Sequence, residues 1–275
     1  MNAIVKTNYS KLKPTLFFLP LLLLLIIFLL LYNHGSLNAN NYIQVQKDCF
    51  YYINYNLGQY PNITYNLTQI GDASIFLSFL IIFIVYAPKM WEALLSASLV
   101  SLVASNFLKN LFLVPRPSEV FDNNSFVIIG KAATGFASLP SGHSITVFTT
   151  LTVLMYAFIP KDIKFKILWF FSIIIIGLCI VFTRVGVGAH YPLDVIIGSI
   201  VGYISGLTGI LMSQKFKIWN WINNKKCYPI FMLLILIASI SLINKIINEN
   251  LIVFYLALIS LFVSLYKIIY VYVKK

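Results

Sequence analysis

Long hydrophobic runs separated by short polar segments dominate the pattern of this 275-residue chain. Several runs reach or exceed the roughly 18 apolar residues that predict a membrane-spanning helix. We therefore predict an all-α fold, a polytopic transmembrane helical bundle. Eight spans are expected at about residues 14–32, 73–88, 92–113, 143–159, 167–183, 191–213, 228–247 and 251–272. The first run follows basic residues and has no small-residue cleavage site, so we interpret it as a retained span.

Composition agrees with a membrane protein. Hydrophobic residues make up 60% of the chain and charged residues only 10%, whereas soluble domains carry about 25% charged residues. The formal net charge of +12 is explained by lysines beside the spans, and we predict no nucleic-acid partner. The three cysteines form no CxxC pair, so the sequence indicates neither a disulfide framework nor a cysteine metal site.

The basic residues also predict the orientation in the membrane. With eight spans, thirteen basic residues flank one side of the bundle and six flank the other. The positive-inside rule places the richer side in the cytoplasm. We therefore predict a multi-pass protein of the cytoplasmic (inner) membrane with both termini in the cytoplasm. The first long outer loop, residues 38–72, is rich in Tyr and Phe, which favours an aromatic belt lying partly in the headgroup zone.

Scarce polar residues gather in three short clusters at the predicted outer ends of the spans. The clusters are residues 109–117, residues 140–143 and residues 183–194. The chain has only two arginines and three histidines, and both arginines and two of the histidines lie in these clusters. This gathering of arginine and histidine is the first indication of a functional site in the sequence.

The basic residues of the clusters suit a phosphate. Arginine offers a planar fork that binds two oxygens, and lysine supplies a point charge. Lys109, Arg116 and Arg184 provide these groups. Ser141 and Gly142 stand at the predicted start of a span, where backbone N–H groups point toward an anion and glycine allows a close approach. The clusters therefore predict an anion pocket at the outer face of the cytoplasmic membrane.

Two histidines and one aspartate complete the clusters. His190 and Asp194 are four residues apart and share one face if they are helical. A carboxylate bonded to one imidazole nitrogen leaves the other free as a nucleophile or base. His143, from a different loop, is then available to protonate a leaving oxygen.

Each element also has an ordinary structural interpretation. Lys109 is typical of a lysine that extends to the interface, Ser141 of a helix N-cap, and His190 with Asp194 of a structural pair. Each of these interpretations is favoured when its element stands alone. The combination of all the elements on one face, in this order and spacing, favours a catalytic site. No set of His, Asp and Glu with ligand spacing is present on that face, so we predict no metal site.

Together, the three clusters resemble the Lys-x6-Arg-Pro, Pro-Ser-Gly-His and Ser-Arg-x5-His-x3-Asp signature of the type-2 phosphatidic acid phosphatase superfamily. The resemblance covers residues 14–213, and it departs from the family at Thr183, where the family usually has serine. It implies a six-helix phosphatase core, residues 1–227, plus two additional C-terminal helices, residues 228–275, whose role it does not explain.

The resemblance also implies roles for the cluster residues. His190 is the nucleophile that forms a phosphohistidine, Asp194 orients it, and His143 is the general acid. The phosphate is bound by Lys109, Arg116, Ser141, Gly142 and Arg184. No metal or other cofactor is expected.

A site at the outer face of the cytoplasmic membrane, reached from the bilayer, favours a lipid substrate. We predict a metal-independent lipid phosphate phosphatase acting on undecaprenyl diphosphate, phosphatidylglycerol phosphate, phosphatidic acid or a lipid A phosphate. The main alternative is a phosphotransferase that uses the same histidine, for example on lipid A. A vanadate-dependent oxidant and a non-enzymatic lipid transporter are further alternatives, and the complete set of catalytic residues argues against the transporter.

Overall fold

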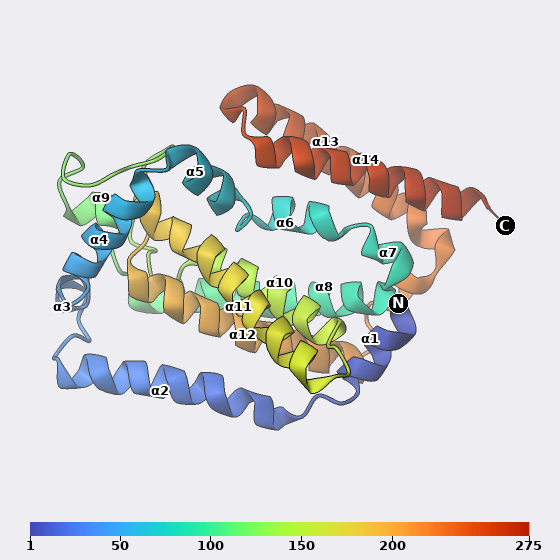
Figure 1. The fold of residues 1–275 in the computed structure, drawn as a ribbon, viewed down its shortest axis with the longest axis horizontal. Coiled ribbons are helices and arrows are strands. Elements are labelled where there is room, and N and C mark those ends of the chain that lie inside the picture. The colour runs from blue at the N-terminus through green and yellow to red at the C-terminus, as the bar shows by residue number, and fades with distance from the viewer. Residues whose placement is uncertain (275) are drawn as a thin grey trace.

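The computed structural model describes residues 1–274, and every regular element within them is helical (Figure 1). The predicted all-α fold is therefore confirmed. The α-helices are α1 (Asn2–Tyr9), α2 (Phe18–Asn33), α3 (Ala39–Gln44), α4 (Lys47–Gly58), α5 (Pro61–Gln69), α6 (Ala73–Leu80), α7 (Phe83–Tyr86), α8 (Pro88–Phe112), α9 (Pro117–Val120), α10 (Gly142–Ala157), α11 (Ile163–Gly186), α12 (Pro192–Lys215), α13 (Tyr228–Glu249) and α14 (Ile252–Val273). Short 3-10 turns cover Pro14–Phe17, Asn220–Asn223 and Lys225–Cys227.

Six helical stretches within residues 1–274 are long and apolar enough to cross a membrane. They contain α2, α8, α11, α12, α13 and α14 and correspond to six of the eight predicted spans. The chain is therefore a multi-pass membrane protein.

The predicted span over residues 73–88 is corrected by the structure. It forms two short helices, α6 and α7, separated by a turn at Ile81 and Ile82. Two carbonyls that a continuous helix would use internally accept side-chain donors instead. The indole of Trp91 donates to the carbonyl of Leu80 at 3.0 Å, and the hydroxyl of Ser260 donates to the carbonyl of Ser78 at 3.0 Å. These bonds satisfy the turn without water.

The predicted span over residues 143–159 is the 16-residue helix α10, which is shorter than a typical span of about 20 residues. It lies in the middle of the bundle against α8, α11 and α12. Its threonines Thr149, Thr150 and Thr152 are all buried. Because protein rather than lipid surrounds α10, these hydroxyls are tolerated in a membrane bundle.

Close packing of α12 against α10 and α8 forms the centre of the fold. A Cβ at Gly202 would stand 2.5 Å from the carbonyl oxygen of Ile145, and one at Gly198 would stand 2.7 Å from that of Ser141. Gly209 meets the backbone of Ala97 on α8 in the same way. Small residues that let helix backbones approach are typical of membrane bundles. This packing fixes the start of α10 beside the start of α12.

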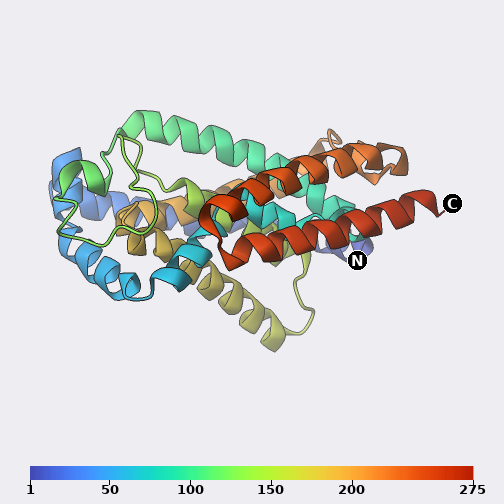
Figure 2. The ribbon, with the colours of Figure 1, turned by 90° about the horizontal axis from the view of Figure 1, so that it is seen from above.

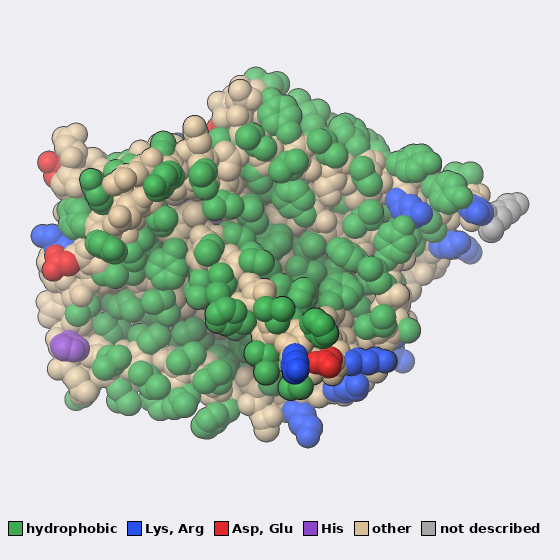
Figure 3. All heavy atoms as spheres, viewed as in Figure 1, with side chains coloured by type: hydrophobic (Ala, Val, Ile, Leu, Met, Phe, Trp, Pro, Cys, Tyr) green, Lys and Arg blue, Asp and Glu red, His purple; other side chains and the backbone are tan. Residues whose placement is uncertain are grey.

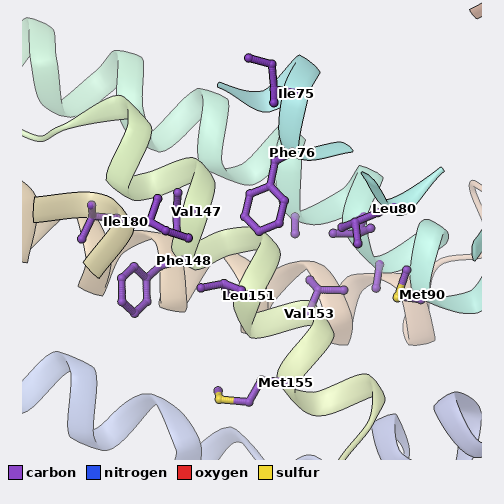
Figure 4. Packing of buried hydrophobic residues seen from close by; sticks show 14 of the residues in the cluster. Ile75, Phe76, Leu80, Met90, Val147, Phe148, Leu151, Val153, Met155 and Ile180 are labelled. Atoms are coloured by element: carbon purple, nitrogen blue, oxygen red, sulfur yellow. The ribbon is translucent and has the colours of Figure 1, made fainter. Parts of the chain in front are cut away.

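Apolar side chains from α6 close the bundle on another side. Figure 4 shows Phe76 pointing from α6 toward α10, whose Leu151 and Val153 lie nearby. These residues belong to the continuous hydrophobic core. The core therefore holds the short helix α6, and with it the segment before α6, against the central helices.

Residues 38–72 fold as α3, α4 and α5. Some of their aromatic residues are exposed, as an aromatic belt predicts, including Tyr52 and Tyr55. Others are core residues: Tyr42 and Phe50 are buried, and the Phe50 ring lies 5.7 Å from that of Tyr191. The prediction of an interfacial belt is thus correct for only part of this segment, because its helices also cover the end of the bundle.

The two ends of the bundle differ. Both chain ends, marked N and C, lie at one end in Figure 1, and most of the Lys side chains visible in Figure 3 gather there. Helices α3, α4, α5 and α9 cover the other end. Helices α13 and α14 run side by side as a hairpin on one flank (Figure 2), and α14 packs on α5, α6 and α7.

Candidate active site

The three sequence clusters meet at the end of the bundle covered by α3, α4, α5 and α9. Helices α8 and α11 end there, and α10 and α12 begin there (Figure 1). Lys109 and Arg184 therefore stand in the last turns of their helices, whereas His143 and Asp194 stand in first turns. Opposite chain directions thus bring residues more than 80 positions apart to one level of the bundle.

The chain between α8 and α10 is held in place by backbone bonds. Leu113, at φ 46°, ends α8 in the left-handed region, which is uncommon for a leucine. Beyond it, the N–H of Arg116 donates to the carbonyl of Gly135, and the N–H of Ser138 donates to the carbonyl of Val114, both at 3.0 Å. The two sides of the loop are thereby tied together, with Arg116 and Ser138 both directed at the site.

His190 and Asp194 meet, but not on one helical face as the spacing predicts, because His190 lies in the bend before α12. Nδ1 of His190 lies 3.5 Å from Oδ2 of Asp194. On the other side of the ring, Nη1 of Arg116 lies 3.4 Å from Nε2 and donates to the carbonyl of Ala189 at 3.2 Å. Arginine only donates, so this arrangement suits the tautomer with its proton on Nδ1. Nε2 is then the nitrogen with a free electron pair.

Asp194 is held by groups that the sequence clusters did not include. The hydroxyl of Tyr42 donates to Oδ1 at 2.7 Å, and the hydroxyl of Ser138 donates to Oδ2 at 2.6 Å. The N–H of Tyr191 also donates to Oδ2, at 3.0 Å. Asp194 is completely buried, and these three donors satisfy its carboxylate. Burial first, and then the charge and hydrogen bond of Asp194, raise the pKa of Tyr42 well above its ordinary value, so Tyr42 stays a donor.

The charges of three cations act on His190. Burial first, and then the charges of Arg116, Arg184 and Lys109, lower the pKa of His190 well below its ordinary value. The imidazole is therefore neutral at pH 7, and its 3.5 Å contact with Asp194 is not an ion pair. A neutral imidazole with a free Nε2 beside three positive groups is suited to attack an anionic phosphorus centre.

The start of α10 supplies the other predicted phosphate-binding groups. Ser141 is buried, its hydroxyl accepts the N–H of Ser144 at 3.4 Å, and its own N–H donates to the carbonyl of Asp194 at 3.0 Å. Ser141 thus serves as the N-cap that its ordinary interpretation predicts. The N–H groups of Gly142 and His143 begin the helix, where intrahelical bonds do not use them. A Cβ at Gly142 would stand 3.3 Å from Nζ of Lys109, so the lysine ammonium lies directly over this helix start.

Arg184 is partly buried at the end of α11. Its Nη1 donates to the hydroxyl of Thr68 at 3.1 Å, whereas its buried Nε has no hydrogen-bond partner within residues 1–274. An unpaired buried guanidinium nitrogen is costly, and a bound phosphate oxygen would satisfy it. Thr183, the departure from the family pattern, is buried and directs its hydroxyl to the carbonyl of Ile180 in its own helix.

His143 lies against a segment that the sequence clusters also did not include. A Cβ at Gly71 would stand 2.8 Å from Cδ2 of His143. The groups that act on its charge are Arg184, His190, Asp72 and Lys109. The structure therefore brings His143 to the same group of cations as His190. Within residues 1–274, no group of three or more His, Cys, Asp or Glu side chains is arranged to hold a metal ion.

Comparison with known proteins finds relatives over the part of the chain that holds this site. The family model described as the PAP2 superfamily matches residues 89–218. A lipid A 1-phosphatase of Rhizobium etli is 34% identical over 134 residues, which are 46% of this chain and 53% of the relative. One of Rhizobium johnstonii is 34% identical over 112 residues, 40% of this chain and 43% of the relative. The chain thus matches about half the length of these curated relatives.

The crystal structure of Aquifex aeolicus LpxE aligns with a TM-score of 0.49 and 23% sequence identity, covering 62% of this chain and 96% of that one. The region matched by the family model contains all three sequence clusters, from Lys109 to Asp194. Over its residues 89–218, this chain is similar to the PAP2 superfamily.

Proposed function

We propose that this protein is a metal-independent phosphatase that removes a phosphate from a membrane lipid through a phosphohistidine intermediate. The observation that carries the proposal is the environment of His190: Nδ1 faces Asp194, Nε2 faces Arg116, and the charges of three cations act on the ring. In the first step Nε2 attacks phosphorus, the bond to the lipid oxygen breaks, and His143 protonates that oxygen. In the second step water attacks phosphorus, and inorganic phosphate leaves His190.

Charge explains why this site needs no cation from solution. Lys109, Arg116 and Arg184 supply three positive charges where negative charge gathers in the transition state. The N–H groups at the start of α10 add further donors. Asp194 balances the imidazolium character that His190 acquires as the N–P bond forms, as the aspartate does in a catalytic triad.

An apolar cavity beside the site supports a lipid as the substrate. It measures about 460 Å³, lies between α2, α8 and α12, and has Tyr42, Val114 and Leu139 in its wall. Tyr42 also binds Asp194, and Leu139 follows Ser138 directly. An acyl chain in this cavity would therefore lie beside the phosphate-binding residues. The curated relatives are both lipid A 1-phosphatases, which makes an anionic, acylated glycolipid phosphate the first substrate to test.

The experiment is phosphate release by the purified protein from a panel of lipid A, undecaprenyl diphosphate, phosphatidylglycerol phosphate and phosphatidic acid. Soluble nitrophenyl phosphate serves as the comparison without an acyl chain. Leu108→Trp fills the cavity wall and is expected to reduce lipid turnover at least tenfold while sparing nitrophenyl phosphate. Leu99→Trp, at an exposed site on the same helix, is the matched control. Release from no substrate in the panel would refute the proposed function.

A lipid phosphotransferase is the rival reaction at the same residues. Water is favoured as the acceptor because the site lies under the polar loop segments at the end of the bundle. Radiolabelled lipid diphosphate, incubated with candidate lipid acceptors, distinguishes the two reactions. Label in free phosphate supports hydrolysis, whereas label on a second lipid with little free phosphate establishes transfer.

The proposed setting is the cytoplasmic (inner) membrane, with both termini in the cytoplasm and the site facing the periplasm or exterior. The support is the basic asymmetry: Lys residues gather at the end that holds both termini (Figure 3), and the site lies at the other end. A reporter fused after residue 275 should report the cytoplasm, and one inserted in the 119–131 loop should report the outer side. A cytoplasmic signal from the 119–131 loop would reverse the orientation.

A further inference from the structure

The α13–α14 hairpin lies outside the matched family region and is tied to the site end of the bundle by polar bonds. Nζ of Lys245 on α13 lies 2.7 Å from Oδ2 of Asp72. The hydroxyl of Tyr65 donates to Oε2 of Glu249 at 2.9 Å. The N–H of Val253 donates to Asn66 at 3.1 Å. All three bonds reach residues 65–72, which we call the α5–α6 corner.

The α5–α6 corner also touches the candidate active site. Thr68 accepts from Arg184, and Gly71 lies directly against the ring of His143. A Cβ at Gly71 would come within 2.8 Å of the imidazole, so no larger residue fits there without a shift. One short segment therefore contacts the hairpin on one side and the proposed general acid on the other.

Asp72 is the acidic group of this corner. The charged or titratable groups that act most on His143 are Arg184, His190, Asp72 and Lys109, and of these only Asp72 is an acid. Its Oδ1 accepts the N–H and the hydroxyl of Ser74 at 2.8 and 2.6 Å, and its Oδ2 accepts Lys245. Burial tends to raise the pKa of Asp72, but the bonds from Lys245 and Ser74 outweigh it and lower that pKa. Asp72 is therefore a fixed carboxylate at neutral pH.

We propose that Asp72 and Lys245 are positioning residues for His143. The carboxylate of Asp72 stabilises the protonated imidazole, and Lys245 from the hairpin weakens this stabilisation by partly neutralising the carboxylate. This role rests on the proposed function, in which His143 donates a proton. It gives the C-terminal hairpin a part in the reaction without contact to substrate. The hairpin holds the α5–α6 corner against His143 and sets the net charge next to it.

Opposite charge changes should therefore move the titration of His143 in opposite directions. Asp72→Asn removes the negative charge, which favours the neutral imidazole and lowers the pKa of His143. Lys245→Met leaves Asp72 without its neutralising partner and raises that pKa. Each shift is expected to be about 0.5 pH unit, which is modest because the ion pair is partly exposed. The double variant Asp72→Asn with Lys245→Met restores the wild-type net charge at this corner, so its His143 pKa should lie near the wild-type value.

The chain has only three histidines, so NMR of ¹⁵N-histidine-labelled protein in micelles measures this titration directly. Removal of each histidine in turn assigns the signals. Ser260→Ala is the matched control: it breaks a hydrogen bond from the hairpin to Ser78 without changing a charge, and should leave the His143 titration unmoved. Shifts in the same direction for both charge variants, no shift beyond the control, or a His143 that stays neutral throughout would overturn the proposal.

Activity then links the titration to function. The alkaline limb of kcat for lipid phosphate release should move to lower pH in Asp72→Asn and to higher pH in Lys245→Met. A wild-type protein that releases no phosphate contradicts the proposed function, whereas the NMR titration still tests the pairing. An active protein whose alkaline limb stays fixed in both variants contradicts the role of the hairpin alone.

Discussion

The central helices α10 and α12 and the α13–α14 hairpin are attached to the molecule in different ways. In the most apolar stretch of α12, 56% of the residues are buried. Its glycines bring helix backbones into contact. In the corresponding stretches of α13 and α14, only 22% and 33% of the residues are buried. The hairpin packs on α5, α6 and α7 through the apolar face of α14, and near the site side-chain bonds such as Lys245–Asp72 add to this packing.

The difference separates two ways of controlling a site. Backbone contact between α10 and α12 fixes the positions of His143 and Asp194, because neither helix can slide without a clash. Partly exposed polar bonds fix positions weakly, so the hairpin acts mainly by the charge that it brings. Variants of the central helices should therefore alter catalysis or folding strongly, and hairpin variants should adjust it.

The largest expected effect is at His190. His190→Ala removes the proposed nucleophile and should abolish both turnover and any acid-labile, base-stable phosphoenzyme. The protein should remain folded in detergent, because its core contacts are otherwise kept. The matched control is His34→Ala, at the exposed end of α2, which should leave turnover unchanged. Phosphoenzyme persisting in His190→Ala would place the nucleophile elsewhere.

His143→Ala tests the division of labour between the two histidines. A lipid alkoxide is a poor leaving group and needs a proton, whereas nitrophenolate does not. Turnover of the lipid should fall by about 10²–10⁴-fold, which is the usual contribution of a general acid. The loss for nitrophenyl phosphate should be much smaller. Equal losses on both substrates would mean that His143 binds phosphate instead of donating a proton.

Gly202→Val tests the backbone contact between α12 and α10. Its side chain would meet the carbonyl of Ile145 and the Cβ of Phe148. Overpacking of this kind costs about 1–3 kcal/mol and should lower the thermal unfolding midpoint in detergent. Ser260→Ala on the hairpin removes one hydrogen bond, worth about 0.5–1.5 kcal/mol, and should lower the midpoint less. The reverse order would mean that the hairpin, rather than the glycine packing, holds the bundle together.

The sequence predicted the helical fold and the meeting of the three clusters well, because both depend on local pattern. Apolar runs define most spans, and Lys109, Arg184, His143 and Asp194 stand at helix ends that must lie at the same level. The broken span at Ile81 was not predictable from periodicity. The carbonyls of Leu80 and Ser78 beside the break accept side-chain donors from Trp91 and Ser260, and such tertiary contacts are not visible in a local pattern.

The supporting residues of the site were missed for a similar reason. Tyr42 lies 152 positions from Asp194, in a segment whose aromatic residues were interpreted as an interfacial belt. Ser138 stands only two residues before Pro140, but one serine near a motif carries no signal by itself. Asp72 and Lys245 are 173 positions apart. Long-range pairs of this kind are fixed by packing rather than by spacing.

The smallest expected effect is that of chelation, and it distinguishes a site whose positive charge comes from side chains from one that is charged by an added metal ion. Positive charge at His190 comes from Lys109, Arg116 and Arg184, which EDTA cannot remove. Excess EDTA should therefore leave turnover within about twofold of its value without EDTA, since a metal would be needed only to neutralise the phosphate.

Vanadate, which adopts a pentacoordinate geometry like that of the transition state, should compete with the lipid. Arg184→Lys keeps the charge but loses the planar fork, and it should weaken vanadate inhibition without creating a metal requirement. Loss of activity in EDTA that magnesium restores would show that these three side chains do not suffice.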